Sequence, residues 1–210
     1  IKGADIRKGM PLVVPFDLSD VASPWNRDRK SLDLCELERS FRGPPRRWSI
    51  VREDGHLTNR LRRTRIPVNF PLSDNFLYII GLWLAEGGKE PGSRNPTLAF
   101  SVGSIPKAVL TLCTYFGSFG VNVSGSPANP YDYSVRSSVF AALFDYLGLF
   151  ATSKGGTKAF PSFFWDLSQR QRRIMLAGLW DGDGSHVFNG EGTLAQKSHA
   201  LVRDMYHSLT

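Results

Sequence analysis

A nine-residue block occurs twice in this chain, and no other feature restricts the fold as strongly. Residues 79–87 read IIGLWLAEG and residues 176–184 read LAGLWDGDG. The copies align without gaps: Gly, Leu and Trp match at positions three to five, an acid stands at position eight, and Gly closes each block. A repeat of this kind predicts two structurally equivalent units.

Each block ends a predicted helix. The first helix has Ser73 or Asp74 as its N-cap, and the second begins at a capping box formed by Ser168 and Gln171. The glycine that closes each block is expected to stop its helix.

Small residues mark one face of each helix. Gly81 and Ala85 are four residues apart, as are Gly178 and Gly182. Glycine inside a helix lowers the stability of the helix by about 1 kcal/mol relative to alanine. A helix face without bulky side chains, however, lets the backbones of two helices approach closely. We therefore predict that the two helices pack as a pseudo-twofold pair. The alternative is that each helix crosses a strand at its glycine.

Two acids occupy equivalent positions in the last turns of these helices. Glu86 and Asp183 lie 97 residues apart. A carboxylate at a helix C-terminus is unfavourable, and two converging carboxylates resist joint ionisation. A divalent cation relieves both penalties, and oxygen ligands favour Mg²⁺ or a similar ion. Asp181 has no counterpart in the first copy, where Leu84 stands, so we interpret it as a local residue.

The remaining pattern alternates helices and strands, which predicts an α+β fold. Strands are expected at 97–102, 131–135, 185–188 and 193–196, and helices at 105–119, 138–147 and from residue 198 onward. The first 70 residues favour mostly β-structure. Short strands are expected within 1–20, a hairpin over 49–68 that turns at Asp54-Gly55, and one short helix around 31–40.

Positive charge is concentrated in the first third of the chain. The net charge is +7, and residues 1–70 hold 15 Lys and Arg against 9 Asp and Glu. All nine basic residues from 39 to 65 are arginines, whose planar side chain suits phosphate and guanine edges. The stretch is either a solvated surface or a DNA-binding arm that uses Arg46, Arg47, Arg60, Arg62, Arg63 and Arg65.

Composition excludes several classes of protein. Hydrophobic residues make up 41% and charged residues 21%, which argues against wholesale disorder. The longest apolar run, residues 76–85, is about half of the ~20 residues that cross a bilayer, so no membrane partner is expected. Two cysteines are too few for a disulfide scaffold and suit a reducing cytosol, which favours a cytoplasmic or nucleoid-associated protein.

The two blocks resemble the paired motifs of the LAGLIDADG homing endonucleases. The second block keeps seven of the nine letters and the first keeps four, with Glu86 in place of Asp. The resemblance implies an endonuclease domain over 71–210, built from αββαββα units, with a first repeat at 71–160 and an incomplete second at 161–210. It implies a monomer that uses Mg²⁺ or Mn²⁺ to cut both strands of a long, asymmetric DNA site, with Glu86 and Asp183 as catalytic metal ligands.

The same resemblance implies two catalytic lysines. Lys158, in KAFP, resembles the K-x-x-P block upstream of the family's second motif, and Lys197 resembles a second lysine in the strand after it. Their expected role is to position water and offset charge during phosphodiester hydrolysis. A single lysine is otherwise more often a solvated surface residue.

Residues 3–15, GADIRKGMPLVVP, resemble an intein block of the form A-x-D-L-x-x-G-D-x-V, with Met10 where Asp is usual. This implies that residues 1–70 hold a splicing-domain remnant plus the Arg-rich DNA-contacting segment. It also implies that the chain is a piece of a longer intein, with the exteins of a host protein as partners in the precursor.

Two other functions stay open. The scaffold can serve a nucleic-acid-binding protein, such as an RNA maturase or a regulator, or an intein whose nuclease has decayed. A pure binder has no need for the two acids, and this chain keeps both.

Overall fold

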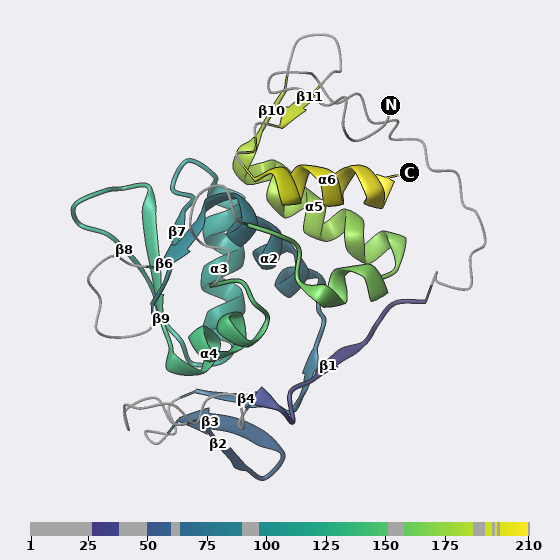
Figure 1. The fold of residues 1–210 in the computed structure, drawn as a ribbon. Helices are drawn as coiled ribbons and strands as arrows, with labels where there is room; N and C mark the ends of the chain where they lie inside the picture. The colour runs from purple at the N-terminus through teal and green to yellow at the C-terminus, as the bar shows by residue number, and fades with distance from the viewer. Residues whose placement is uncertain are drawn as a thin grey trace.

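The computed structural model describes residues 27–37, 50–59, 64–89, 97–150, 158–186, 192–194, 196 and 198–209. This part of the chain is a mixed α+β protein with antiparallel sheets, so the predicted class is confirmed (Figure 1). The strands are β1 (Ser31–Asp33), β2 (Ile50–Glu53), β3 (His56–Asn59), β4 (Arg65–Pro67), β5 (Asn69–Pro71), β6 (Gly87–Lys89), β7 (Thr97–Ser101), β8 (Val123–Gly125), β9 (Asp132–Arg136), β10 (Gly184–His186) and β11 (Gly192–Leu194). The helices are α2 (Asp74–Glu86), α3 (Pro106–Gly117), α4 (Ser138–Tyr146), the 3₁₀ helix η2 (Ser162–Asp166), α5 (Gln169–Asp183) and α6 (His199–Leu209).

The elements from α2 to α4 run helix, strand, strand, helix, strand, strand, helix. Their four strands form one antiparallel sheet in the order β6-β7-β9-β8. Leu98, Phe100 and Val135 are buried because they face the helices, which lie together beside the sheet (Figure 1). After α5, the hairpin β10–β11 and α6 follow in the order that the first unit begins with.

The two long helices begin where the sequence predicts. The Ser73 hydroxyl accepts a hydrogen bond from the Phe76 backbone N–H and caps α2. Ser168 and Gln171 form a complete capping box at the start of α5. These caps satisfy N–H groups that have no partner within a helix.

One hydrophobic core runs through the described residues on both sides of residue 70, from Leu32 to Leu201. Trp83 is fully buried at its centre, and its ring meets Phe100, Phe144 and Phe150 edge to face. The domain boundary at residue 70 stays a prediction, but the packing of the core does not divide there.

A second sheet, β2-β3-β4, contains the predicted hairpin. Its turn places Asp54 at φ 49° and Gly55 at φ 72°, the left-handed values that a two-residue turn of this kind needs. The sheet contacts α4 through a hydrogen bond of 2.8 Å from the Asn59 amide to the Ser138 hydroxyl.

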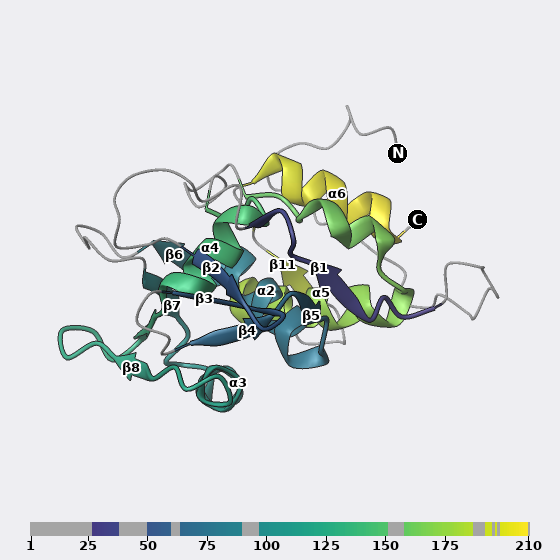
Figure 2. The same cartoon turned by 90° about the horizontal axis from the view of Figure 1, so that it is seen from below.

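The helix expected around residues 31–40 is wrong over residues 31–33, which form a strand; Leu37 is helical, and residues 38–40 lie outside the described part of the chain. Leu32 and Leu34 are buried while Asp33 and Cys35 are exposed, which is the two-residue period of a strand. Strand β1 pairs antiparallel with β5, and the two lie side by side in Figure 2.

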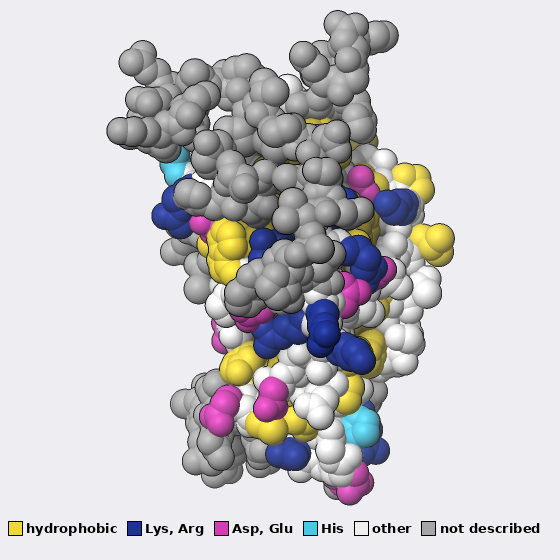
Figure 3. All heavy atoms as spheres, turned by 90° about the vertical axis from the view of Figure 1, so that its right-hand side faces the viewer, with side chains coloured by type: hydrophobic (Ala, Val, Ile, Leu, Met, Phe, Trp, Pro, Cys, Tyr) yellow, Lys and Arg dark blue, Asp and Glu magenta, His cyan; other side chains and the backbone are white. Residues whose placement is uncertain are grey.

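Residues 28–33, which we call the strap, tie the start of α5 to the start of α2. The Arg170 guanidinium donates to Asp28 Oδ2 at 2.6 Å and to Asp74 Oδ2 at 2.8 Å. The Gln171 side chain accepts from the Arg29 backbone N–H at 2.8 Å and donates to the Arg29 carbonyl at 2.7 Å. Figure 3 shows Lys and Arg side chains beside Asp and Glu side chains on the side of the molecule where the strap lies.

Several predictions fall outside the described residues. These are the strands within 1–20, Lys197, and the arginines Arg46, Arg47, Arg60, Arg62 and Arg63. Among the helices that the structure describes, none has the length and apolar character needed to span a membrane.

Candidate active site

Helices α2 and α5 touch backbone to backbone. A Cβ atom added at Gly81 would lie 1.9 Å from the carbonyl oxygen of Met175, and one added at Gly178 would lie 2.1 Å from that of Tyr78. Tyr78 and Met175 are equivalent positions of the repeat, so the two contacts are images of each other. The pair is therefore pseudo-symmetric, and only glycine fits at these two positions.

A third contact brings the last turns together. A Cβ atom at Gly182 would lie 2.4 Å from the Cβ of Ala85 and 3.2 Å from the Cγ of Glu86. The four small residues predicted for the helix interface are thus all found in it. The acids that follow them lie at the same end of the pair.

The glycines that close the two blocks end their helices, as predicted, but they do so without the left-handed conformation common at helix ends. Gly87 has φ −82° and Gly184 also has φ −82°, so neither residue needs left-handed freedom. Instead, a Cβ at Gly87 would lie 2.4 Å from the Trp83 ring, and one at Gly184 would lie 2.7 Å from the Trp180 ring. The chain turns straight from each helix into a strand over the preceding indole, and a side chain would block that path.

The acids of the two repeats influence each other. Burial raises the pKa of Glu86, the negative charge of Asp183 raises it further, and Lys158 lowers it. Burial also raises the pKa of Asp183, which Lys158 and a hydrogen bond from Gln196 oppose. Two half-buried carboxyls that both resist ionisation form an environment that favours a cation.

Lys158 lies at this common end. Its Nζ donates to the carbonyl oxygen of Trp83 at 3.1 Å and to that of Ala85 at 2.7 Å. Both carbonyls belong to the last turn of α2, and that of Trp83 also accepts a hydrogen bond from the Gly87 backbone N–H. Burial lowers the pKa of Lys158, and the charges of Asp183 and Glu86 oppose that change. The lysine is therefore held by the helix end and faces both acids.

Gln196 is a site residue that the sequence reasoning missed. Its side-chain amide donates a hydrogen bond to Asp183 Oδ2. Two residues further along the chain, the Ser198 hydroxyl donates to the backbone carbonyl of Lys158. A glutamine two residues after a short strand carries no pattern of its own, so only its position after the second block offered a signal.

The interpretation of Asp181 as a local residue is wrong. Its Oδ2 accepts a hydrogen bond from the Tyr78 hydroxyl at 2.7 Å, across the helix interface. It also accepts from Lys107 Nζ at 3.3 Å, and that ammonium lies 4.9 Å from the centre of the Tyr78 ring. Asp181 therefore joins three helices.

The donor set at the helix ends fits a divalent cation. Glu86 and Asp183 supply hard oxygen ligands from two rigid elements, which is the ligand type that Mg²⁺ and Mn²⁺ accept. In the part of the chain that the structure describes, no cluster of three or more His, Cys, Asp and Glu side chains provides a closed metal cage.

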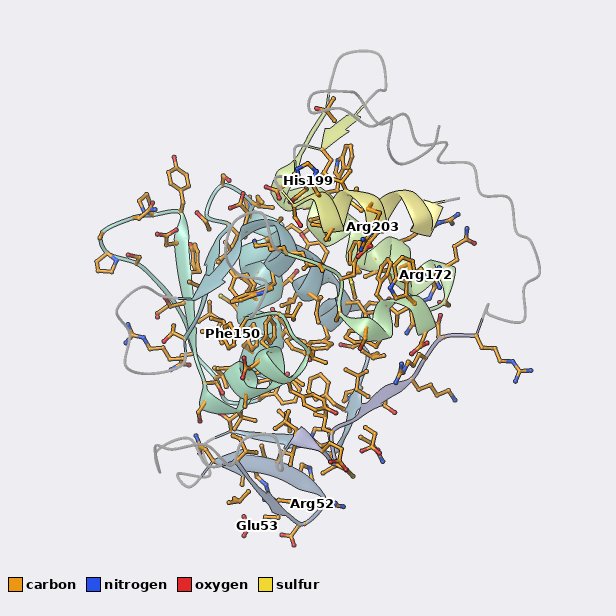
Figure 4. All side chains as sticks on the ribbon, viewed as in Figure 1. Arg52, Glu53, Phe150, Arg172, His199 and Arg203 are labelled. Atoms are coloured by element: carbon orange, nitrogen blue, oxygen red, sulfur yellow. The ribbon has the colours of Figure 1, made fainter. Side chains whose placement is uncertain are left out.

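Of the arginines predicted to contact DNA, Arg65 lies within the described residues. It is exposed on β4, with its guanidinium 3.7 Å from the Asp54 carboxylate. Arg52 and Glu53 extend from β2, which lies on the other side of β3 in the same sheet (Figure 4).

No model of a protein family matches this chain, and no curated protein gives a significant match.

Proposed function

We propose that this chain is a site-specific double-strand DNA endonuclease of the LAGLIDADG homing type, which hydrolyses phosphodiesters with a divalent metal. The observation that carries the proposal is the packing of α2 on α5. That packing brings the acid of each repeat to a common end beside Lys158. The element order from α2 to α4 supports the αββαββα unit of the proposed fold, which is more specific than the α+β class.

Glu86 and Asp183 would hold the metal. When bound, a divalent cation supplies positive charge to the phosphate and lowers the pKa of water, which are the two needs of the hydrolysis. The protein's own contribution is positioning. The backbone contacts at Gly81 and Gly178 fix the spacing of the helices, so the two carboxylates need no reorganisation during the reaction.

Lys158 supplies positive charge beside the two acids, and Gln196 orients one of them. Lys158 keeps an ammonium at the end of α2 through its two carbonyl contacts, where it offsets negative charge that develops on the leaving oxygen. Gln196 holds one carboxylate oxygen of Asp183 and so orients the other.

Charge supports duplex DNA as the substrate. The chain carries a net charge of +7, concentrated before residue 70, and phosphate contacts by Lys and Arg dominate affinity for DNA. The Arg-rich segment is proposed as a contacting arm. The intein origin, and with it the exteins as partners in a precursor, rests on the resemblance of residues 3–15.

The test uses a supercoiled plasmid that carries the uninterrupted host sequence across the insertion site. With Mg²⁺, the protein extended to its full reading frame is expected to give linear product. Glu86→Gln combined with Asp183→Asn should abolish cleavage and keep DNA binding, measured by fluorescence anisotropy. Asp145→Asn, the same chemical change on the exposed face of α4, is the matched control and should cleave normally.

Cleavage that survives the double substitution would contradict the assignment of the acids. Tight, sequence-specific binding without cleavage by the unaltered protein would contradict the nuclease and favour a binding protein on the same scaffold.

A further inference from the structure

The helix interface raises the question of how each helix selects its partner. Because the contact is pseudo-twofold, equivalent positions of α2 and α5 face each other. An interface of this kind is self-complementary, so each helix could also pair with a second copy of itself from another chain. The three possible pairings are α2 with α5, α2 with a second α2, and α5 with a second α5. Two contacts are not symmetric, so they differ among these pairings.

The first contact is Ala85 against Gly182. The Cβ that alanine would add at position 182 lies 2.4 Å from the Cβ of Ala85, which is far inside contact distance. In a pair of two α2 helices, Ala85 would face Ala85 at this same point. Those helices would have to move apart, and the backbone contact at Gly81 would be lost.

The second contact is Tyr78 against Asp181. The repeat places Met175 and Leu84 at the equivalent positions, and both are fully buried and apolar. In a pair of two α5 helices, Asp181 would therefore face Met175, which has no hydrogen to donate. It would lose the Tyr78 hydroxyl, and it would lose Lys107 as well because that residue comes from α3 of the first unit. The Asp181 side chain is 30% exposed and keeps some hydration, so losing these donors at the interface is unfavourable but costs less than it would for a fully buried carboxylate.

We infer that Ala85–Gly182 and Tyr78–Asp181 select the pairing of α2 with α5 over the pairing of either helix with its own copy. One contact excludes α2–α2 by shape and the other excludes α5–α5 by polarity. The helix pair consequently closes within one chain. This inference concerns assembly and does not depend on the proposed nuclease activity.

The like-helix contacts can be reproduced inside a single chain. Gly182→Ala recreates the Ala–Ala contact of an α2–α2 pair and is expected to lower the urea midpoint clearly. Ala85→Gly recreates a Gly–Gly contact and should lower it less. The exchanged variant, Ala85→Gly with Gly182→Ala, restores one alanine against one glycine and should recover most of the loss. If Gly182→Ala is as stable as the unaltered chain, or if the exchange recovers nothing, the steric part of the inference is overturned.

The polar contact is tested in the same way. Tyr78→Met recreates the Met–Asp contact of an α5–α5 pair and is expected to lower the urea midpoint. Adding Asp181→Leu gives the Met–Leu combination found at positions 175 and 84, and should raise the midpoint again. Tyr78→Phe, which removes only the hydroxyl, is the control for loss of the hydrogen bond. A further loss on adding Asp181→Leu would overturn the role of Asp181 in partner selection.

Discussion

Gly81→Ala tests the backbone contact on which the site depends. The new Cβ would lie 1.9 Å from the Met175 carbonyl oxygen and 2.7 Å from the Leu179 nitrogen, and neither backbone atom can rotate away. The helices must therefore separate by about 1.5 Å to reach ordinary contact, and a gap of even about 1 Å forfeits roughly a quarter to a half of the dispersion energy at each contact. Overpacking of this kind costs up to about 3 kcal/mol, of which the better helix propensity of alanine returns about 1 kcal/mol. We expect a net loss of about 2 kcal/mol.

Urea unfolding followed by circular dichroism measures this loss. With a slope of about 2 kcal/mol per molar urea, the midpoint should fall by about 1 M. Gly117→Ala is the matched control, since Gly117 ends α3 and a Cβ there meets nothing within 4 Å. It should leave the free energy of unfolding unchanged or raise it by up to about 1 kcal/mol. A Gly81→Ala protein as stable as this control would refute the close packing of the two helices.

Three further predictions concern the acids, the cap and the lysine. The pKa values of Glu86 and Asp183 are raised in the folded state, so ionisation destabilises the fold at neutral pH and the penalty disappears as the pH falls below the unfolded values. Glu86→Gln with Asp183→Asn should therefore raise the urea midpoint at pH 7 and leave it unchanged near pH 3. Gln171→Ala removes the side-chain half of the capping box and two hydrogen bonds to the strap, and should cost about 2 kcal/mol of unfolding free energy, whereas Gln169→Ala in the same turn should cost less than about 0.5 kcal/mol. Lys158→Met should lower the rate of plasmid cleavage by about 100-fold or more without weakening DNA binding in an anisotropy assay.

The sequence predicted the parts of the fold that rest on strong local signals. Ser73 precedes an apolar helix, and Ser168 opens an S-x-x-Q capping box. Gly81 and Gly178 occupy equivalent positions of the repeated block, which indicated the helix interface. Strands β6 and β8 were not predicted, because three residues are too few to show a two-residue period.

Other features depend on partners that are distant in the sequence. Strand β1 exists because β5 pairs with it, and Asp181 has a role because Tyr78 lies opposite. Neither partner can be identified from a local window. The spacing of Trp83 and Gly87 can be seen in the sequence, since both blocks have tryptophan four residues before glycine. The reason that glycine is needed there, the close approach of the indole ring, can be seen only in the structure.

The strap has a practical consequence for any attempt to transplant this helix pair into another protein. Residues 28–33 add a strand beside β5, their backbone and carboxylate groups bind the first turn of α5, and the Lys30 carbonyl accepts from the Leu72 N–H just before α2. A graft that starts at residue 71 would leave Arg170 with one carboxylate instead of two and the Gln171 amide without its backbone partner. The portable module therefore starts before residue 28, well upstream of the first repeated block.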